Sequence, residues 1–191
     1  RKADRLAWRR KLAVLGPSTN TIVQPEMEEM RPPGVTNHYS RIFTPNSKAI
    51  SDETFMAGTL LISEGTAAAV DSAMTLEPDW MVLGMSAVTF YGGLKGAEKF
   101  HADISARTNG VGVTTGALAS AHALRTLGVK RLAFLSPYYP VANAEVRRFF
   151  TDCGFDVKKD VPLRAPSWLG IAEITEKTLV KTLKELDGDD V

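Results

Sequence analysis

The sequence contains one cysteine, Cys153, and no signal for secretion or membrane insertion. A single thiol excludes an internal disulfide framework, and the chain has no CxxC or Cys/His spacing typical of a metal site. No apolar run approaches the ~18 residues that cross a bilayer, and no segment resembles a signal peptide. We therefore expect a cytoplasmic protein without membrane partners.

An excess of charge of one sign is also lacking, because 23 Lys and Arg residues balance 22 Asp and Glu residues. No helix face or loop concentrates the basic residues, so we expect no nucleic acid partner. The basic residues at 1–10 are interrupted by Asp4, Leu6 and Trp8 and are interpreted as a solvated lead-in to the first strand. Neither GxGxxG nor GxxxxGK(S/T) occurs, which leaves nucleotide binding without a motif.

Short apolar runs ending in small or polar residues are present instead. Continuous apolarity is typical of strands covered on both faces, as in a parallel sheet. These runs predict strands at residues 11–15, 80–83, 110–113 and 131–135, with further strands near 39–43 and 155–158.

Helical patterns lie between these strands. Ser51 can cap a helix that runs to about residue 75, and Thr175 can cap the last helix. Strands that alternate with helices predict an α/β protein with a doubly wound, mainly parallel sheet. The predicted inner faces, in chain order, are Ala57, Leu60, Leu61 and Ala68; Ala97, Phe100, His101 and Ile104; Ala117, Ala121 and Leu124; Val146, Phe149, Phe150 and Cys153; and Leu179, Leu183 and Leu186.

The chain contains an internal repeat. Residues 11–17 and 131–137 align position for position, and each is followed by a polar loop and a helix. The first of these helices leads into the predicted strand at 80–83, whereas the second leads to Val191. We expect the sequence to lack a C-terminal segment that would add the equivalent strand and a loop facing residues 84–86. Reading the coding sequence past Val191 would test this.

The ends of the predicted strands indicate the chemistry of a binding site. Ligands of an open parallel sheet bind beyond the carboxyl ends of its strands. Those ends, residues 16–21, 84–86, 114–116 and 136–139, are rich in hydroxyl and amide groups and contain no acid or base. Neutral donors suit an anion, above all a carboxylate, and suit a metal poorly.

Each candidate residue also has a structural interpretation. Ser18, Thr19 and Asn20 could cap a helix, and Thr114 and Thr115 are more typical of caps than of ligands. Tyr138 and Tyr139 are interpreted as turn aromatics, and Met85 as a core residue. The remaining candidates are interpreted as structural or exposed histidines, which are His38, His101 and His122, and as a buried thiol, which is Cys153.

Three segments resemble a known superfamily. Residues 83–92 resemble the part of arylmalonate decarboxylases in which a Gly-Thr-Ser loop leads into Phe-Tyr. Residues 127–133 and the following Pro-Tyr are similar to that family and to the maleate cis–trans isomerases, and residues 16–21 are closer to the isomerases. The chain is thus identified as a member of the aspartate/glutamate racemase superfamily over nearly its whole length.

The resemblance implies two pseudo-symmetric, flavodoxin-like lobes that enclose the substrate, a pair that would leave the repeat described above. We assign residues 1–110 to the first lobe and 111–191 to an incomplete second lobe. Racemases use one cysteine from each lobe to exchange a proton, whereas the decarboxylases keep only the second and have glycine at the first position. Gly84 occupies that first position, which argues against racemase or two-thiol isomerase chemistry.

The resemblance also implies residue roles. Asn20 would bind a substrate carboxylate, while Ser86 and Tyr138 would act as catalytic donors to a carboxylate or enediolate oxygen. Gly84, Met85, Thr114 and Thr115 would line the site. Met85 departs from the pattern, because the decarboxylases have threonine there and a segment one residue shorter.

These roles imply a cofactor-free enzyme that acts on a small mono- or dicarboxylate through an enediolate-like intermediate. Decarboxylation, a lyase reaction, and cis–trans isomerisation are its candidate reactions. Two alternatives stay open: a non-catalytic carboxylate-binding protein on the same scaffold, and a flavin or nucleotide binder of the flavodoxin type. A homo-oligomer is compatible with the sequence.

Overall fold

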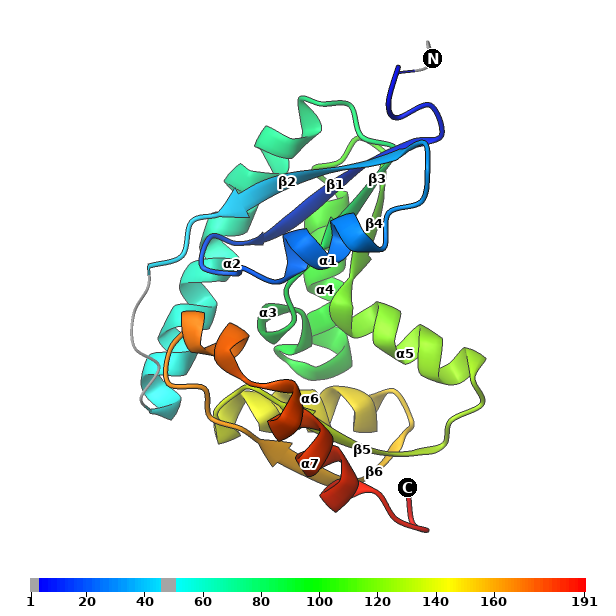
Figure 1. Ribbon diagram of the computed structural model, residues 1–191. Coiled ribbons are helices and arrows are strands. Elements are labelled where there is room, and N and C mark those ends of the chain that lie inside the picture. Colours follow the sequence, from blue (N-terminus) through cyan, green and yellow to red (C-terminus); the bar gives the residue numbers. More distant parts are fainter. Residues whose placement is uncertain (1–3, 46–50) are drawn as a thin grey trace.

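The computed structural model describes residues 4–45 and 51–191, whose strands form two parallel sheets. The first sheet has the order β2-β1-β3-β4, and the second pairs β5 with β6 (Figure 1). The parallel α/β architecture and the positions of the expected strands are therefore confirmed. The strands are β1 (Arg10–Pro17), β2 (Val35–Ile42), β3 (Trp80–Leu83), β4 (Gly112–Thr115), β5 (Arg131–Ser136) and β6 (Asp156–Pro162).

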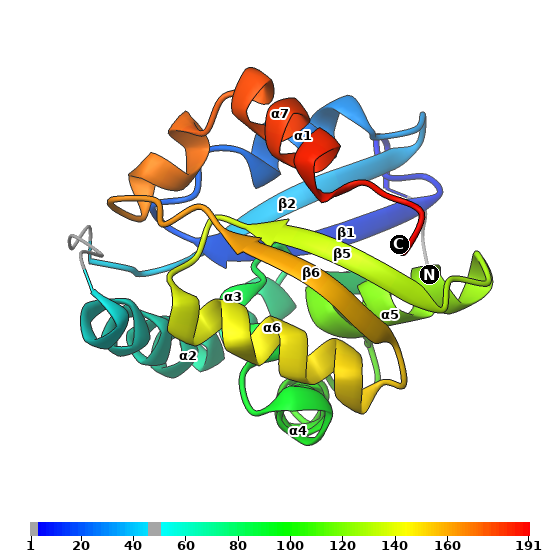
Figure 2. The ribbon, with the colours of Figure 1, turned by 90° about the horizontal axis from the view of Figure 1, so that it is seen from below.

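Helices cover both sheets. Helix α1 lies on one face of the first sheet and α2 on the other, while α6 and α7 enclose the β5–β6 pair (Figure 2). The sequence predicted α2, α4, α5, α6 and α7 but not the short α1, α3 and η1. The elements are α1 (Val23–Glu29), α2 (Asp52–Met74), α3 (Ala87–Phe90), α4 (Gly93–Ser105), α5 (Gly116–Thr126), α6 (Pro140–Asp152), the 3-10 helix η1 (Leu169–Glu173) and α7 (Glu176–Leu186).

The inner face of α2 differs from the prediction. Leu60 and Leu61 are 48% and 45% exposed, and Ala57 and Ala68 also face solvent. The buried face consists of Phe55, Gly58, Thr59, Ile62, Thr66, Ala69, Val70 and Ala73.

Local hydrogen bonding explains this exchange of faces. The hydroxyls of Thr59 and Thr66 donate to the carbonyls of Phe55 and Ile62, one turn earlier, at 3.0 and 2.8 Å. A threonine that bonds its own helix in this way can be buried without an unpaired hydroxyl. The prediction of this face was wrong because it considered apolar residues alone and passed over Thr59 and Thr66, which lie on the buried side.

The two sheets share one hydrophobic core. A single cluster of buried side chains runs from Leu15 of β1 through Phe55 of α2 to Phe149 of α6 and Val157 of β6. The start of α2 also contacts the start of α6, because the Val141 backbone N–H donates to the Asp52 carboxylate at 3.0 Å.

The pairing of the strands follows the sequence repeat. β1 pairs in parallel with β2, and β5 pairs in parallel with β6. β1 has β3 on its other side, whereas no strand within residues 4–45 and 51–191 pairs with the other edge of β5. β4 belongs to the first sheet although it follows residue 110, and the division into lobes 1–110 and 111–191 stays a prediction.

Candidate functional site

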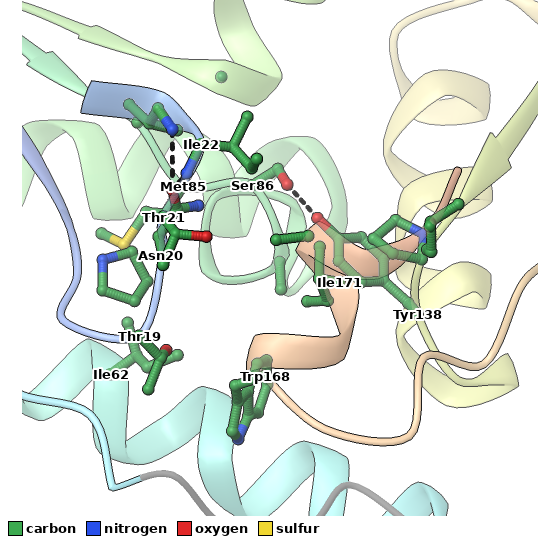
Figure 3. A pocket seen from close by; sticks show the side chains of 18 of the residues that line it. Thr19, Asn20, Thr21, Ile22, Ile62, Met85, Ser86, Tyr138, Trp168 and Ile171 are labelled. Atoms are coloured by element: carbon green, nitrogen blue, oxygen red, sulfur yellow. Dashed lines mark hydrogen bonds between the residues drawn. The ribbon is translucent and has the colours of Figure 1, made fainter. Parts of the chain in front are cut away.

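A cavity of about 590 Å³ is lined by residues that follow strands of both sheets (Figure 3). Loops that follow β1, β3 and β5 line it at the carboxyl ends of those strands, together with Gly116 at the start of α5. Ile62 of α2 and residues of the η1–α7 region complete the wall. The cavity thus lies at the strand ends, where the sequence analysis places the binding site.

Ser86 and Tyr138 meet in this cavity. Their hydroxyls hydrogen-bond to each other and so link the loop after β3 to the loop after β5 (Figure 3). Tyr138 is 5% exposed, and burial raises the pKa of its hydroxyl to about 12. Tyr138 is therefore a neutral hydrogen-bond donor at physiological pH. Since only one of the two hydroxyl protons is used between them, the pair has a further proton to donate to a ligand.

Thr89 fixes the loop that carries Ser86. Its hydroxyl donates to the Ser86 carbonyl at 2.9 Å and accepts from the Ala117 backbone N–H at 3.2 Å. The loop is also held to β1, because the Gly84 N–H donates to the Leu15 carbonyl at 2.7 Å. The side chain of Ser86 makes no capping bond to α3, so its hydroxyl is available to the cavity.

Gly84 has no space for a side chain in this arrangement. A Cβ atom there would lie 2.4 Å from a methyl group of Val23. A thiol at this position would require Val23 to move. Met85, which follows, is 9% exposed and lines the cavity.

Asn20 has both a structural and a ligand-facing part. Its side-chain oxygen accepts from the backbone N–H groups of Ile22 and Val23 at 3.0 and 2.9 Å, which shapes the turn into α1. Its side-chain N–H₂ group has no partner among the described residues and belongs to a residue that lines the cavity. Its role in binding a carboxylate stays a prediction.

Thr114 and Thr115 do not line the cavity, although their neighbour Gly116 does. The Thr114 hydroxyl accepts from the Trp80 indole N–H at 2.8 Å. Thr115 is 1% exposed, and its hydroxyl has no partner among the described residues. The structure therefore does not bring these two residues together with Ser86 and Tyr138.

The sequence did not indicate the remaining walls. Ile62, Trp168 and Ile171 contribute apolar side chains to the cavity wall (Figure 3). Trp168 is buried, and the centroid of its ring lies 4.8 Å from the centroid of the Phe55 ring. Glu26 of α1 is the one charged side chain among the described residues that line the cavity. These residues follow no strand directly, so a search of strand ends could not find them.

The cysteine and the histidines lie elsewhere. Cys153 ends α6 and does not line the cavity; partial burial raises the pKa of its thiol, which is therefore protonated at neutral pH. His122 is exposed, and His101 contacts the Val113 carbonyl at 3.1 Å. Within the described residues, no group of three or more His, Cys, Asp or Glu could hold a metal ion, and no helix is long and apolar enough to cross a membrane.

Solved structures with the same fold include three informative ones. The maleate cis-trans isomerase of Nocardia farcinica bound to Tris is 19% identical over 95% of this chain and 74% of that chain, with a TM-score of 0.83. A maleate isomerase variant from Pseudomonas putida S16 with maleate is 19% identical over 95% of this chain and 74% of that chain, with a TM-score of 0.82. A double mutant of arylmalonate decarboxylase in the liganded form is 17% identical over 94% of this chain and 74% of that chain, with a TM-score of 0.74. These likenesses show the fold.

The family itself is shown by sequence. No curated protein matches the chain. The sequence model of the arylmalonate decarboxylase family matches residues 47–189, which is well over half of the chain. That range contains Gly84, Ser86 and Tyr138. The chain belongs to the arylmalonate decarboxylase family.

Proposed function

We propose that the protein is a cofactor-free enzyme that binds a small carboxylic acid and stabilises an enediolate-like intermediate derived from it. The observation that carries this proposal is the hydroxyl pair of Ser86 and Tyr138, which joins the two lobes inside the cavity. The substrate carboxylate would accept the hydroxyl proton that the Ser86–Tyr138 bond leaves free, with the Asn20 N–H₂ group as a further donor.

The two hydroxyls suit the charge that develops in such a reaction. Loss of CO₂ from a malonate, or addition of a nucleophile to a double bond next to a carboxylate, leaves an electron pair that delocalises onto the carboxylate oxygens. Preplaced donors stabilise this negative charge more than that of the substrate, and removal of one such donor costs ~2.7–4 kcal/mol in well-studied enzymes. Tyr138, with its pKa raised to about 12, keeps its proton while donating.

The apolar wall supports the same function. Ile62, Trp168 and Ile171 would hold the apolar part of the substrate and keep water from the hydroxyl pair. A hydrogen bond to an oxyanion is stronger where water is excluded and the local dielectric constant is low.

One observation favours a second candidate, a carboxylate-binding protein that performs no reaction. The described residues that line the cavity include no cysteine, and both candidate reactions of the family resemblance use a thiol as proton donor or nucleophile. This candidate predicts binding of carboxylates without turnover.

A product assay tests the proposal. Purified protein is incubated separately with phenylmalonate and with maleate, and the mixtures are followed by proton NMR for phenylacetate or fumarate. We expect one of these products, and a loss of at least about 100-fold in rate for Tyr138→Phe. Tyr91→Phe is the matched control, because Tyr91 is exposed and does not line the cavity. Binding without product would favour the second candidate, and neither binding nor product would contradict both.

A further inference from the structure

A buried relay of polar side chains lies beneath Tyr138. Ser136, at the end of β5, is 4% exposed, and Asn143, in the first turn of α6, is 2% exposed. The Ser136 hydroxyl donates to the Asn143 side-chain oxygen at 2.7 Å and accepts from the Tyr138 backbone N–H at 3.2 Å. Asn143 is therefore linked to the backbone of Tyr138 through the Ser136 hydroxyl.

The relay continues to the surface of the second lobe. The Asn143 N–H₂ group donates to the Asp160 carboxylate, which also accepts from the Arg147 guanidinium. Arg147 in turn donates to the Val157 carbonyl at 2.7 Å. Burying an amide costs free energy unless it is paired, and here each link has a partner.

The charged end of the relay sets the direction of every bond in it. A carboxylate can only accept, so the N–H₂ side of Asn143 must face Asp160 and its oxygen must face Ser136. The Ser136 hydroxyl must then donate to Asn143, which leaves its lone pairs for the Tyr138 N–H. A side chain that merely filled space at position 143 would not impose this direction.

The relay acts on a part of the loop that other bonds leave free. The carbonyls of Ser136, Pro137 and Tyr138 accept from backbone N–H groups at 2.8, 2.9 and 3.1 Å. Their donors are Leu163, Ala165 and Arg164 respectively. Among the hydrogen bonds of the described chain, the one that fixes the Tyr138 N–H is the bond to Ser136. The loop is thus held through its carbonyls from one side and through this N–H from the other.

We propose that Asn143 is a positioning residue that holds the Tyr138 hydroxyl against Ser86 and thereby sets the affinity of the cavity for a carboxylate. This inference rests on the proposed function, because it assumes that the cavity binds a carboxylate. The relay fixes the loop, and the loop directs the ring of Tyr138 toward Ser86.

A double-mutant cycle separates positioning from packing. Dissociation constants for maleate and for phenylmalonate are measured by calorimetry for the wild type, Asn143→Ala, Tyr138→Phe and the double variant. We expect Asn143→Ala to weaken binding about ten-fold or more, and the double variant to bind no more weakly than Tyr138→Phe alone. An Asn143→Ala protein that is less stable but binds with wild-type affinity, or a double variant with additive losses, would overturn the proposal.

A charge exchange tests the direction of the relay. Asn143→Asp alone sets two carboxylates against each other and should weaken binding. When Asp160→Asn is added, the carboxylate at position 143 accepts from the Ser136 hydroxyl and from the N–H₂ group at position 160. The affinity for maleate should then return to within about three-fold of the wild type. Failure of the folded double variant to recover would contradict the proposal.

Two further outcomes are distinguished. If Asn143→Ala does not fold, Ser136→Ala carries the same test, since it removes the acceptor of the Tyr138 N–H, and unchanged affinity there would overturn the proposal. If Tyr138→Phe binds as the wild type does, or if the wild type binds neither probe, the proposed function fails and this inference fails with it. If Tyr138→Phe weakens binding but Asn143→Ala does not, the positioning role alone is wrong.

Discussion

At the scale of single residues, the environment gives similar side chains different roles in the cavity. Tyr138 is buried, so its hydroxyl keeps its proton, whereas Ser86 is exposed and turns its hydroxyl to the cavity. The Asn20 side-chain oxygen accepts the hydrogen bonds that shape the turn into α1, and its N–H₂ group has no partner among residues 4–45 and 51–191. Thr114 and Thr115, which resemble these residues in the sequence, lie outside the cavity wall.

The raised pKa of Tyr138 predicts a dependence of stability on pH. Its pKa is about 12 in the folded protein and about 10 in the unfolded chain, so folding favours the protonated hydroxyl. This contribution is complete below about pH 10 and is lost as pH rises toward 12. Between pH 9 and 11 the wild type should lose about 1 kcal/mol more free energy of unfolding than Tyr138→Phe, measured by urea denaturation.

The Tyr91→Phe variant serves as the control for that measurement, because it removes the hydroxyl of an exposed tyrosine that lies outside the cavity. Its pH profile should follow that of the wild type. Parallel profiles for the wild type and Tyr138→Phe would show that the hydroxyl is not protected by burial.

Glu26 should select against a second negative charge on the ligand. Its exposed carboxylate lines the cavity and has no ion-pair partner among the described residues. Glu26→Gln should strengthen maleate binding about two- to five-fold at low salt and have less effect at high salt, where the charges are screened. Glu29→Gln, on the same helix but outside the cavity, is the control. Equal effects of both substitutions would contradict a local role for Glu26.

At the scale of elements, the sequence predicted the strands better than the helix faces. Continuous apolar runs marked β1, β3 and β5 because buried parallel strands need apolar side chains on both faces. The inner face of α2 was not predictable from apolarity alone, since Gly58 and Thr59 are buried there while Leu60 is exposed.

The same limit applies to the site. Ser86 and Tyr138 directly follow strands, and reasoning from strand ends and from the family resemblance could bring them together. Trp168 reaches the cavity from an irregular segment, and Glu26 from a helix that has no buried residue to mark it. Tertiary packing places both of these side chains, and a local sequence pattern does not encode it.

Gly58 of α2 should matter for its small size. A Cβ atom there would lie 2.5 Å from the ring of Trp168, which forms part of the cavity wall. Gly58→Ala gains about 1 kcal/mol of helix propensity, but overpacking costs ~1–3 kcal/mol, so we expect a net loss of stability and weaker binding of phenylmalonate. Thermal unfolding and calorimetry measure the two effects.

Gly65→Ala on the same helix is the matched control. A Cβ atom at position 65 would lie 3.1 Å from a methyl group of Ile42, a milder contact that is distant from Trp168. It should leave the binding of phenylmalonate unchanged. A Gly58→Ala protein with wild-type stability and affinity would show that the indole can yield to the added methyl group.

At the scale of the whole molecule, two sheets enclose one cavity and share one core. The buried cluster is continuous from Leu15 to Val157, and Phe55 of α2 packs against both Tyr138 and Trp168. The Ser86–Tyr138 bond also links the loops that follow β3 and β5. The geometry of the cavity therefore depends on how the two sheets pack.

The shared core predicts cooperative unfolding. Far-UV circular dichroism and tryptophan fluorescence should report the same urea midpoint, because neither lobe can lose its packing without exposing the core of the other. Phe55→Ala should lower the free energy of unfolding by about 3–5 kcal/mol and leave a single transition. Two separated transitions in the wild type would mean that the lobes fold independently.

The central claim, that Ser86 and Tyr138 form a carboxylate site, is tested most directly by a crystal structure of the protein soaked with maleate or malonate. The account predicts a carboxylate in the cavity between the Gly84 loop and Tyr138, within hydrogen-bonding distance of both hydroxyls. An occupied ligand site elsewhere on the molecule, with the Ser86–Tyr138 bond undisturbed, would contradict it.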